Sequence, residues 1–233
     1  MFADIRQYVL VLLLLAAQIG FWTHAHTIKP QLGIVPEPVS KATLQAVSFG
    51  DTQFIFRLMG LTIQNAGDSF GRFTALKLYD YKKLHQWFLL LDSLDRDSDF
   101  VAPMASYYYS QTQKYEDVRY VVDYLYQHAS DRVETKWWWL VQAIYLADHK
   151  VKDKNLALQV AKPLIGARNI PVWAQQMPAF VYEKRGEGQQ AAAIMQGIIQ
   201  GAESGTIPEN DMRFMKYFLD ERLKAEGLEI KQK

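Results

Sequence analysis

A serine framed by glycines is the first candidate for chemistry in this chain of 233 residues. The segment Gly67-Asp68-Ser69-Phe70-Gly71 matches the G-x-S-x-G pattern, in which a strained turn between a strand and a helix exposes a nucleophilic serine. That turn must follow a buried strand of a parallel sheet, whereas the flanking sequence has helical periodicity. We therefore expect Gly67 to end one helix and Asp68 or Ser69 to cap the next. No catalytic residue is predicted, and the chain is not predicted to be an enzyme.

An acidic segment offers the second candidate, a calcium loop. Asp95, Asp97 and Asp99 have the spacing with which such a loop begins. Phe100 stands where the loop needs glycine, and Ser106 stands where a bidentate glutamate must close the coordination shell. The segment is therefore interpreted as a helix end, with Asp99 capping the following helix.

Histidines are the remaining candidate metal ligands, because the chain has no cysteine. His24 and His26 could hold copper or zinc together with a third ligand, or they are interfacial polar residues. The absence of cysteine also excludes disulfides and a thiol nucleophile. The sequence predicts no metal and no cofactor.

Two aromatic triplets, Tyr107-Tyr108-Tyr109 and Trp137-Trp138-Trp139, are candidates for binding. Successive residues of a helix point about 100° apart, so at least one member of each triplet should lie near a surface. Trp138 fits the buried stripe by its phase, which leaves Trp137 or Trp139 exposed. The alternative is that all three tryptophans are buried between neighbouring helical hairpins.

The N-terminal segment is apolar enough to enter a membrane. It reads YVLVLLLLAAQIGFW from Tyr8 to Trp22, and the range 5–25 reaches the roughly 20 residues that a bilayer requires if the flanking polar residues snorkel. Tyr8 and Trp22 sit at the predicted interfaces, with Leu12, Leu15 and Ile19 between them in contact with lipid. The alternative is a secretory signal peptide that is cleaved near Ala25.

The orientation of this anchor is not decided by charge, since Lys and Arg are nearly balanced on its two sides. A tail this short usually stays inside, so we expect a single-pass protein of the plasma (inner) membrane. Its soluble domain would lie on the outer face, which is the periplasm in a bacterium. The segment Thr27–Val39, with three prolines, predicts an extended stalk.

The rest of the chain predicts an all-α domain. Apolar residues recur at steps of three and four, as in the stripe Val118, Val121, Val122 and Leu125, and no segment alternates as a strand would. Phe54–Phe56 belongs to a longer helical segment, 52–66. With 26 Lys and Arg against 25 Asp and Glu, the chain lacks the basic excess that nucleic-acid binding requires.

The helices repeat at a fixed interval. Tyr108, Tyr145 and Tyr182 are each 37 residues apart (145 − 108 and 182 − 145), and they lie toward the ends of predicted first helices. Residues 121, 158 and 195 repeat at the same interval in the second helices. A period in the thirties built from paired helices is typical of a solenoid.

These repeats resemble the tetratricopeptide repeat. Ala179, Tyr182 and Ala191 have its spacing, followed by apolar residues at 195 and 198. The second unit matches at Trp138, Val141 and Tyr145, but its second helix fits only after about three extra residues, and in the first unit Asp117 replaces an alanine. The resemblance covers roughly 99–202. It implies antiparallel hairpins stacked as a right-handed solenoid with a concave groove, and it carries no catalytic residues.

The organisation predicted along the chain follows from these features. We expect an anchor (1–26), a stalk (27–39), N-terminal capping helices (40–98), repeats (99–204), and a C-terminal capping helix with a tail (205–233). First helices line the groove in tetratricopeptide-like arrays, so the resemblance implies a partner-binding groove formed by Tyr107, Tyr109, Trp137 and Trp139.

The function expected from this organisation is that of a scaffold. It would be tethered to the membrane and bind a protein or peptide partner in or at the same membrane, as an accessory subunit or assembly factor of a membrane complex. Neither a nucleic acid nor a small-molecule substrate is predicted. The alternative is an exported helical enzyme or ligand-binding protein with a cleaved signal peptide.

Overall fold

The computed structural model describes residues 2–26, 33–69, 72–201 and 207–225. Within these ranges the chain is helical, apart from one antiparallel pair of two-residue strands, β1 (Asp68–Ser69) and β2 (Arg72–Phe73). The prediction of an all-helical protein is therefore confirmed. The segment around Phe54 is the helix α3 (Thr52–Gln64), as expected.

The N-terminal helix α1 (Phe2–Ala25) is the one described helix that is long and apolar enough to cross a membrane. None of its window Tyr8–Ala25 is buried against the rest of the chain. All five predicted anchor residues, Tyr8, Leu12, Leu15, Ile19 and Trp22, are exposed. A signal sequence at the N-terminus has the same length and composition, so both interpretations of this helix stand.

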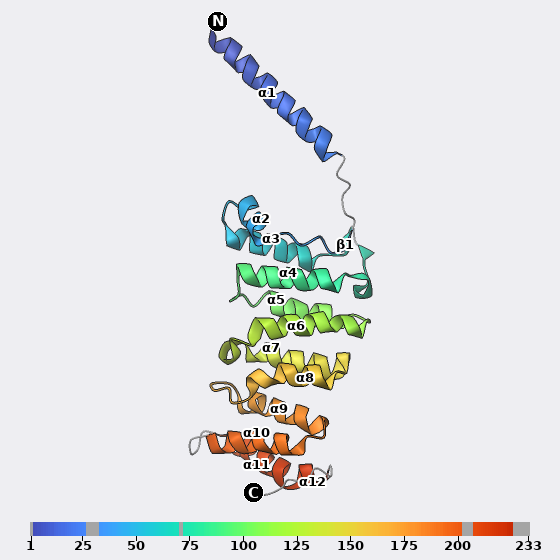
Figure 1. Ribbon diagram of the computed structural model, residues 1–233, viewed down its shortest axis with the longest axis vertical. Helices are drawn as coiled ribbons and strands as arrows, with labels where there is room; N and C mark the ends of the chain where they lie inside the picture. The colour runs from blue at the N-terminus through green and yellow to red at the C-terminus, as the bar shows by residue number, and fades with distance from the viewer. Residues whose placement is uncertain (1, 27–32, 70–71, 202–206, 226–233) are drawn as a thin grey trace.

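The remaining helices stack one upon another in chain order, as Figure 1 shows. The first part of the stack contains α2 (Lys41–Val47), α3, the short η1 (Leu76–Leu78), α4 (Tyr81–Leu94) and α5 (Val101–Pro103), which continues through η2 (Met104–Tyr108) and η3 (Tyr109–Gln111). The middle contains η4 (Tyr115–Asp117), α6 (Val118–Ala129), α7 (Val133–Tyr145), η5 (Leu146–Val151), α8 (Lys154–Ala161) and η6 (Lys162–Leu164). The last part contains α9 (Val172–Lys184), α10 (Gly188–Gly201), α11 (Glu209–Tyr217), η7 (Phe218–Arg222) and α12 (Leu223–Ala225).

Helices that are neighbours in the stack pack against one another. Contacts join α3 to α4, α4 to α6, α6 to α7, α7 to α8, α8 to α9 and α9 to α10. One core of buried side chains extends from Val35 to Val181, and a second lies between α9, α10 and the last helices around Met195 and Phe218. Each helix therefore buries its apolar stripe against the next one along the chain.

The residues of the predicted repeat all lie within or at the end of described helices. Tyr108, Tyr145 and Tyr182 lie at or near the ends of η2, α7 and α9. Val121 and Met195 are fully buried in α6 and α10, and Leu158 is partly buried in α8. The stripe of α6 predicted from its periodicity is completely buried.

The predicted stalk differs from the structure in its second half. Residues 27–32 lie outside the described part, but the segment from Ile34 onward packs on α4 instead of extending freely. Val35 is buried, Trp87 Nε1 donates a hydrogen bond to the Pro36 carbonyl at 2.9 Å, and Lys83 pairs with Glu37. The composition predicted extended backbone in this segment. It did not predict that Trp87, on α4, would hold the segment in place.

Candidate functional site

The two aromatic triplets divide between the core and the surface. Tyr107 and Tyr108 are half exposed, whereas Tyr109 is completely buried. Trp137 is partly buried, Trp138 is 38% exposed and Trp139 is 7% exposed. The exposure predicted for Tyr109 and Trp139 is therefore wrong, and so are the placement of Trp138 in the core and the alternative that all three tryptophans are buried.

The error in α7 is one of helical phase, and a buried lysine explains it. The buried stripe begins at Lys136 and continues through Trp139, Leu140 and Ala143, at steps of three and four. The Lys136 ammonium reaches Asp99 Oδ1 at 2.9 Å and the Asp97 carbonyl at 3.2 Å, so the side chain is buried with its charge paired. Because the buried stripe begins with a charged residue, the sequence pattern favoured neighbouring positions, including Trp138, as the buried ones.

Tyr109 is buried because its hydroxyl is used inside the molecule. It donates to the Ile63 carbonyl at 2.5 Å, and its own carbonyl accepts a hydrogen bond from the Tyr81 hydroxyl at 2.7 Å. Burial raises the pKa of both phenols above the usual range. Tyr109 therefore fastens α3 and α4 to the first hairpin and does not face a partner.

Four aromatic side chains form a continuous surface, which we name the aromatic cluster: Tyr107, Trp137, Trp138 and Trp173. Trp137 contacts Trp138 and Trp173 edge to face, with ring centroids 5.8 and 5.2 Å apart, and Trp138 contacts Trp173 at 6.2 Å. The cluster joins η2, α7 and α9. It thus connects three helices that are separated along the chain.

A hydrogen bond also links two members of the cluster. Trp138 Nε1 donates to the Tyr107 hydroxyl at 2.8 Å. Because that oxygen accepts from the indole, the Tyr107 O–H can donate to a group outside. Trp139 packs behind Tyr107 at 5.9 Å, so the buried tryptophan supports the exposed tyrosine.

Trp173 was missed by the sequence analysis. It is 40% exposed, near the start of α9. The signal was its spacing, since 173 − 138 = 35, which is close to the repeat interval of 37. A search for aromatics at roughly that interval would have found it.

The serine motif does not form a nucleophile elbow. It follows a helix, and Asp68 and Ser69 form β1 of the small hairpin instead of capping a helix, which corrects that prediction. Asp80 caps α4. Gly67 follows α3 with φ +77°, and a Cβ there would clash with the Tyr79 side chain, so glycine is required for packing. No parallel sheet that could position a catalytic serine lies in the described part of the chain.

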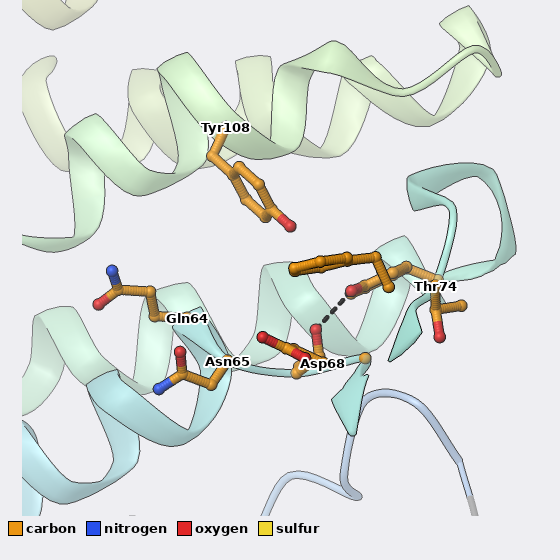
Figure 2. A pocket seen from close by; sticks show the side chains of 9 residues that line it. Gln64, Asn65, Asp68, Thr74 and Tyr108 are labelled. Atoms are coloured by element: carbon orange, nitrogen blue, oxygen red, sulfur yellow. Dashed lines mark hydrogen bonds between the residues drawn. The ribbon is translucent and has the colours of Figure 1, made fainter. Parts of the chain in front are cut away.

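A cavity of about 290 Å³ lies between the end of α3, the hairpin and Tyr108. Figure 2 shows Tyr108 reaching toward it from the helix above, with Gln64 and Asn65 at the end of α3 and Asp68 and Thr74 on the hairpin. Tyr79 closes one wall and donates a hydrogen bond to the Ala66 carbonyl. Burial, with the neighbouring Tyr108 and Asp68, raises the pKa of Tyr79 to about 12.

The acidic segment forms ion pairs and not a calcium loop. Asp95 follows the end of α4, as predicted, and accepts hydrogen bonds from the backbone N–H groups of residues 97 and 98. Asp97 pairs with Arg132, which lowers the pKa of that carboxyl. Asp99 pairs with Lys136 and does not cap α5, contrary to prediction. The carboxylates thus join the loop after α4 to the start of α7.

A buried polar network in the core has the residue types of a catalytic triad. Tyr124 Oη and His128 Nδ1 bond to the two carboxylate oxygens of Asp92 at 2.9 and 2.7 Å. Burial and the Asp92 charge raise the pKa of Tyr124. The His128 side chain is fully enclosed, so substrate cannot reach it. The network joins α4 to α6, and its role is structural.

Among the described residues, no group of three or more His, Asp or Glu side chains could hold a metal ion. His26 stacks on Trp22 with ring centroids 4.7 Å apart. No known family, curated protein or solved structure matches the chain. The functional assignment therefore depends on the site itself, and the aromatic cluster is the surface with the clearest capacity to bind.

Proposed function

We propose that this protein is a membrane-tethered scaffold of tetratricopeptide-like hairpins that binds a protein or peptide partner, as an accessory subunit or assembly factor of a membrane complex. The observation that carries the proposal is the aromatic cluster across three helices that are separated along the chain. The equivalent places of Tyr108, Tyr145 and Tyr182, and the packing of each helix on the next, support a solenoid architecture.

The cluster has the properties of a binding hot spot. Large aromatic side chains that are rigid before binding lose little entropy when a partner covers them. Tyr107, Trp138 and Trp173 are between 38% and 51% exposed and already hold one another by ring contacts and one hydrogen bond. The Tyr107 hydroxyl can still donate, which suits a carbonyl acceptor flanked by apolar groups such as a peptide backbone offers.

The membrane tether raises the effective concentration of the aromatic cluster near partners in the same membrane. α1 is the proposed single-pass anchor in the plasma (inner) membrane, and the stack is proposed to lie on the outer face. A scaffold held in the same membrane as its partner binds effectively even when each contact is weak. The partner is therefore proposed to be a membrane protein or a segment near the membrane.

The test is the composition of the complex around the full chain in its own membrane. Mild detergent extraction, blue-native electrophoresis and mass spectrometry of the shifted band would identify the partner. In the double variant Trp138→Ala/Trp173→Ala, we expect the complex to weaken by at least about 30-fold, which corresponds to roughly 2 kcal/mol lost at a hot spot.

The matched control is Tyr217→Ala, which removes an aromatic side chain of similar exposure (51%) from α11. It should leave the complex intact, and circular dichroism should show both variants folded. A complex that survives the double variant unchanged would contradict the proposal. A native chain that migrates alone after the mildest extraction would contradict it as well.

A further inference from the structure

The first helices of the stack carry an apolar surface that nothing in the described chain covers. We name it the end face, and it consists of Val47, Phe49, Phe54, Leu58 and Leu61. The last three lie at steps of four and three in α3, opposite the stripe Ile55, Phe56 and Ile63 that packs into the core. The outward residues of α3 therefore lie on the side of that helix away from the core.

All five side chains of the end face are exposed to solvent. Phe49 is 100% exposed, Val47 is 62% exposed, and Phe54, Leu58 and Leu61 are between 44% and 55% exposed. Terminal units of stacked helical arrays need a polar outer side to remain soluble. An exposed apolar helix face at that position marks a contact with another apolar phase.

Phe49 carries a second, independent observation. It has φ +52°, the left-handed backbone region that a bulky aromatic residue rarely adopts, and it precedes Gly50 at φ +84°. No side-chain contact in the fold offsets this strain, because the ring is fully exposed. Asparagine or glycine would suit the turn better. Strain without compensation inside the fold points to a role outside it.

The position of the end face in the chain limits what can cover it. Nine residues, 26–34, separate the end of α1 from Val35, which is buried in the stack. Ten steps of at most about 3.6 Å keep Val35 within roughly 36 Å of the end of the membrane helix. α2 begins a few residues later, at Lys41. The tether therefore holds this end of the stack, and not the other, beside the bilayer.

We infer that the end face docks on the lipid surface, with Phe49 and the outward residues of α3 inserted at the level of the headgroups. The inference rests on the proposed role of α1 as a membrane anchor. Arg57, exposed on α3 beside the apolar stripe, has no ion-pair partner among the described residues and can reach lipid phosphates. Asp51 is the acidic neighbour, and its carboxylate is used as the N-cap of α3.

This docking would make the stack stand on the membrane by its first helices. α3 would lie in the plane of the interface, as amphipathic helices do, with its apolar side toward the acyl chains. The aromatic cluster begins further along the stack, on η2, and would stay in the aqueous phase above the surface. The partner would then be bound at a fixed height above the bilayer.

The chain has no cysteine, so single cysteines can report on each surface of the full-length protein. We would place them at Phe49, Leu61, Leu12 and Tyr217, label each with an environment-sensitive fluorophore, and reconstitute the protein in phosphatidylcholine vesicles. Some vesicles would contain lipid spin-labelled near the headgroup end of the acyl chain. Labels at 49 and 61 should be quenched several-fold more than the label at 217, which lies on α11 at the opposite end.

Each result separates the inference from the proposed function. Quenching at 12 without quenching at 49 and 61 would overturn the docking and leave the anchor in place. Absence of quenching at 12 would overturn the anchor and with it the docking. A blue shift at 49 and 61 without quenching would show that protein covers the end face, either α1 or a second copy, and would also overturn the inference.

A matched pair of variants tests whether the apolar face itself drives docking. Leu58→Gln/Leu61→Gln should lower the quenching of the label at 49 several-fold, because both side chains are exposed and their loss leaves the core intact. Leu78→Gln, an exposed leucine (61%) outside the end face, should leave that quenching unchanged. Equal quenching in both variants would contradict the inference.

Discussion

The two ends of the helical stack differ in how far they expose large apolar side chains. At the C-terminal end, the buried Glu183 carboxylate pairs with Arg222 at 2.6 Å, and the guanidinium lies over the rings of Phe180 and Phe218. At the N-terminal end, α3 turns Phe54 and its apolar neighbours outward. The same chain therefore packs phenylalanines together at one end of the stack, the closed end, and leaves Phe54 exposed at the other, the open end. The contrast indicates that the open end is kept apolar for a contact outside the fold.

The largest expected effect tests the closed end. Phe218 is fully buried between Phe180 and Phe214, so Phe218→Ala should lower the free energy of unfolding by about 3 to 5 kcal/mol. Phe54→Ala, at the open end, removes a ring that is 55% exposed and should change it by less than about 0.5 kcal/mol. Urea unfolding of the full chain in detergent, followed by circular dichroism, gives both values. Similar losses in the two variants would remove the contrast between the ends.

At the N-terminal end of the stack, α3 is held by tyrosine hydroxyls that donate hydrogen bonds to backbone carbonyls. Tyr109 and Tyr79 donate to the carbonyls of Ile63 and Ala66, at the end of α3. Burial is the main cause that raises the pKa of both phenols above the ordinary value for tyrosine. A raised pKa means that the neutral phenol is favoured in the folded state, so its stabilisation is fully present below pH 10 and is lost as the pH rises toward the folded pKa.

Alkaline pH should therefore loosen the molecule through these tyrosines. At pH 11 we expect a loss on the order of 1 kcal/mol for a fully buried phenol such as Tyr109, relative to pH 8. Tyr109→Phe should be less stable at pH 8, because the Ile63 carbonyl loses its donor, but its stability should fall less steeply between pH 10 and 11. Urea midpoints across this range measure the slopes. Parallel profiles would show that Tyr109 does not titrate in the unfolding reaction.

The sequence predicted the buried stripe of α6, where valine and leucine mark it clearly. These four positions are all fully buried. The stripe of α7 was placed one residue off because it begins with Lys136, whose burial depends on Asp99 in a distant loop. Periodicity in one helix cannot reveal an ion pair that forms only after two segments meet.

The candidate site was predicted in part for the same reason. Of the four residues predicted to line the groove, Tyr107 is exposed, Trp137 is partly buried, and Tyr109 and Trp139 are buried, whereas Trp138 and Trp173 lie at the surface. The end face could not be predicted, because nothing in the sequence shows which side of α3 lacks a neighbour. The left-handed backbone at Phe49 is likewise set by the turn between α2 and α3.

The smallest expected effect concerns that residue. Phe49→Asn should raise the free energy of unfolding by about 0.5 to 1 kcal/mol, because asparagine tolerates the left-handed region and no buried contact is lost. Val47→Asn is the control, with an exposed side chain at the end of α2 but without positive φ, and it should bring no such gain. Thermal unfolding of the full chain in detergent resolves the two.

A loss of stability in Phe49→Asn would mean that the ring packs within the fold, and the contrast between the ends would fail at its most exposed residue. A gain would show that the chain keeps a phenylalanine where another residue is more stable. Proteins retain such strain where a residue serves a contact outside the folded chain. The same variant should then lose lipid contact at the end face while its free energy of unfolding rises. These two quantities change in opposite directions only if Phe49 serves the contact with the membrane.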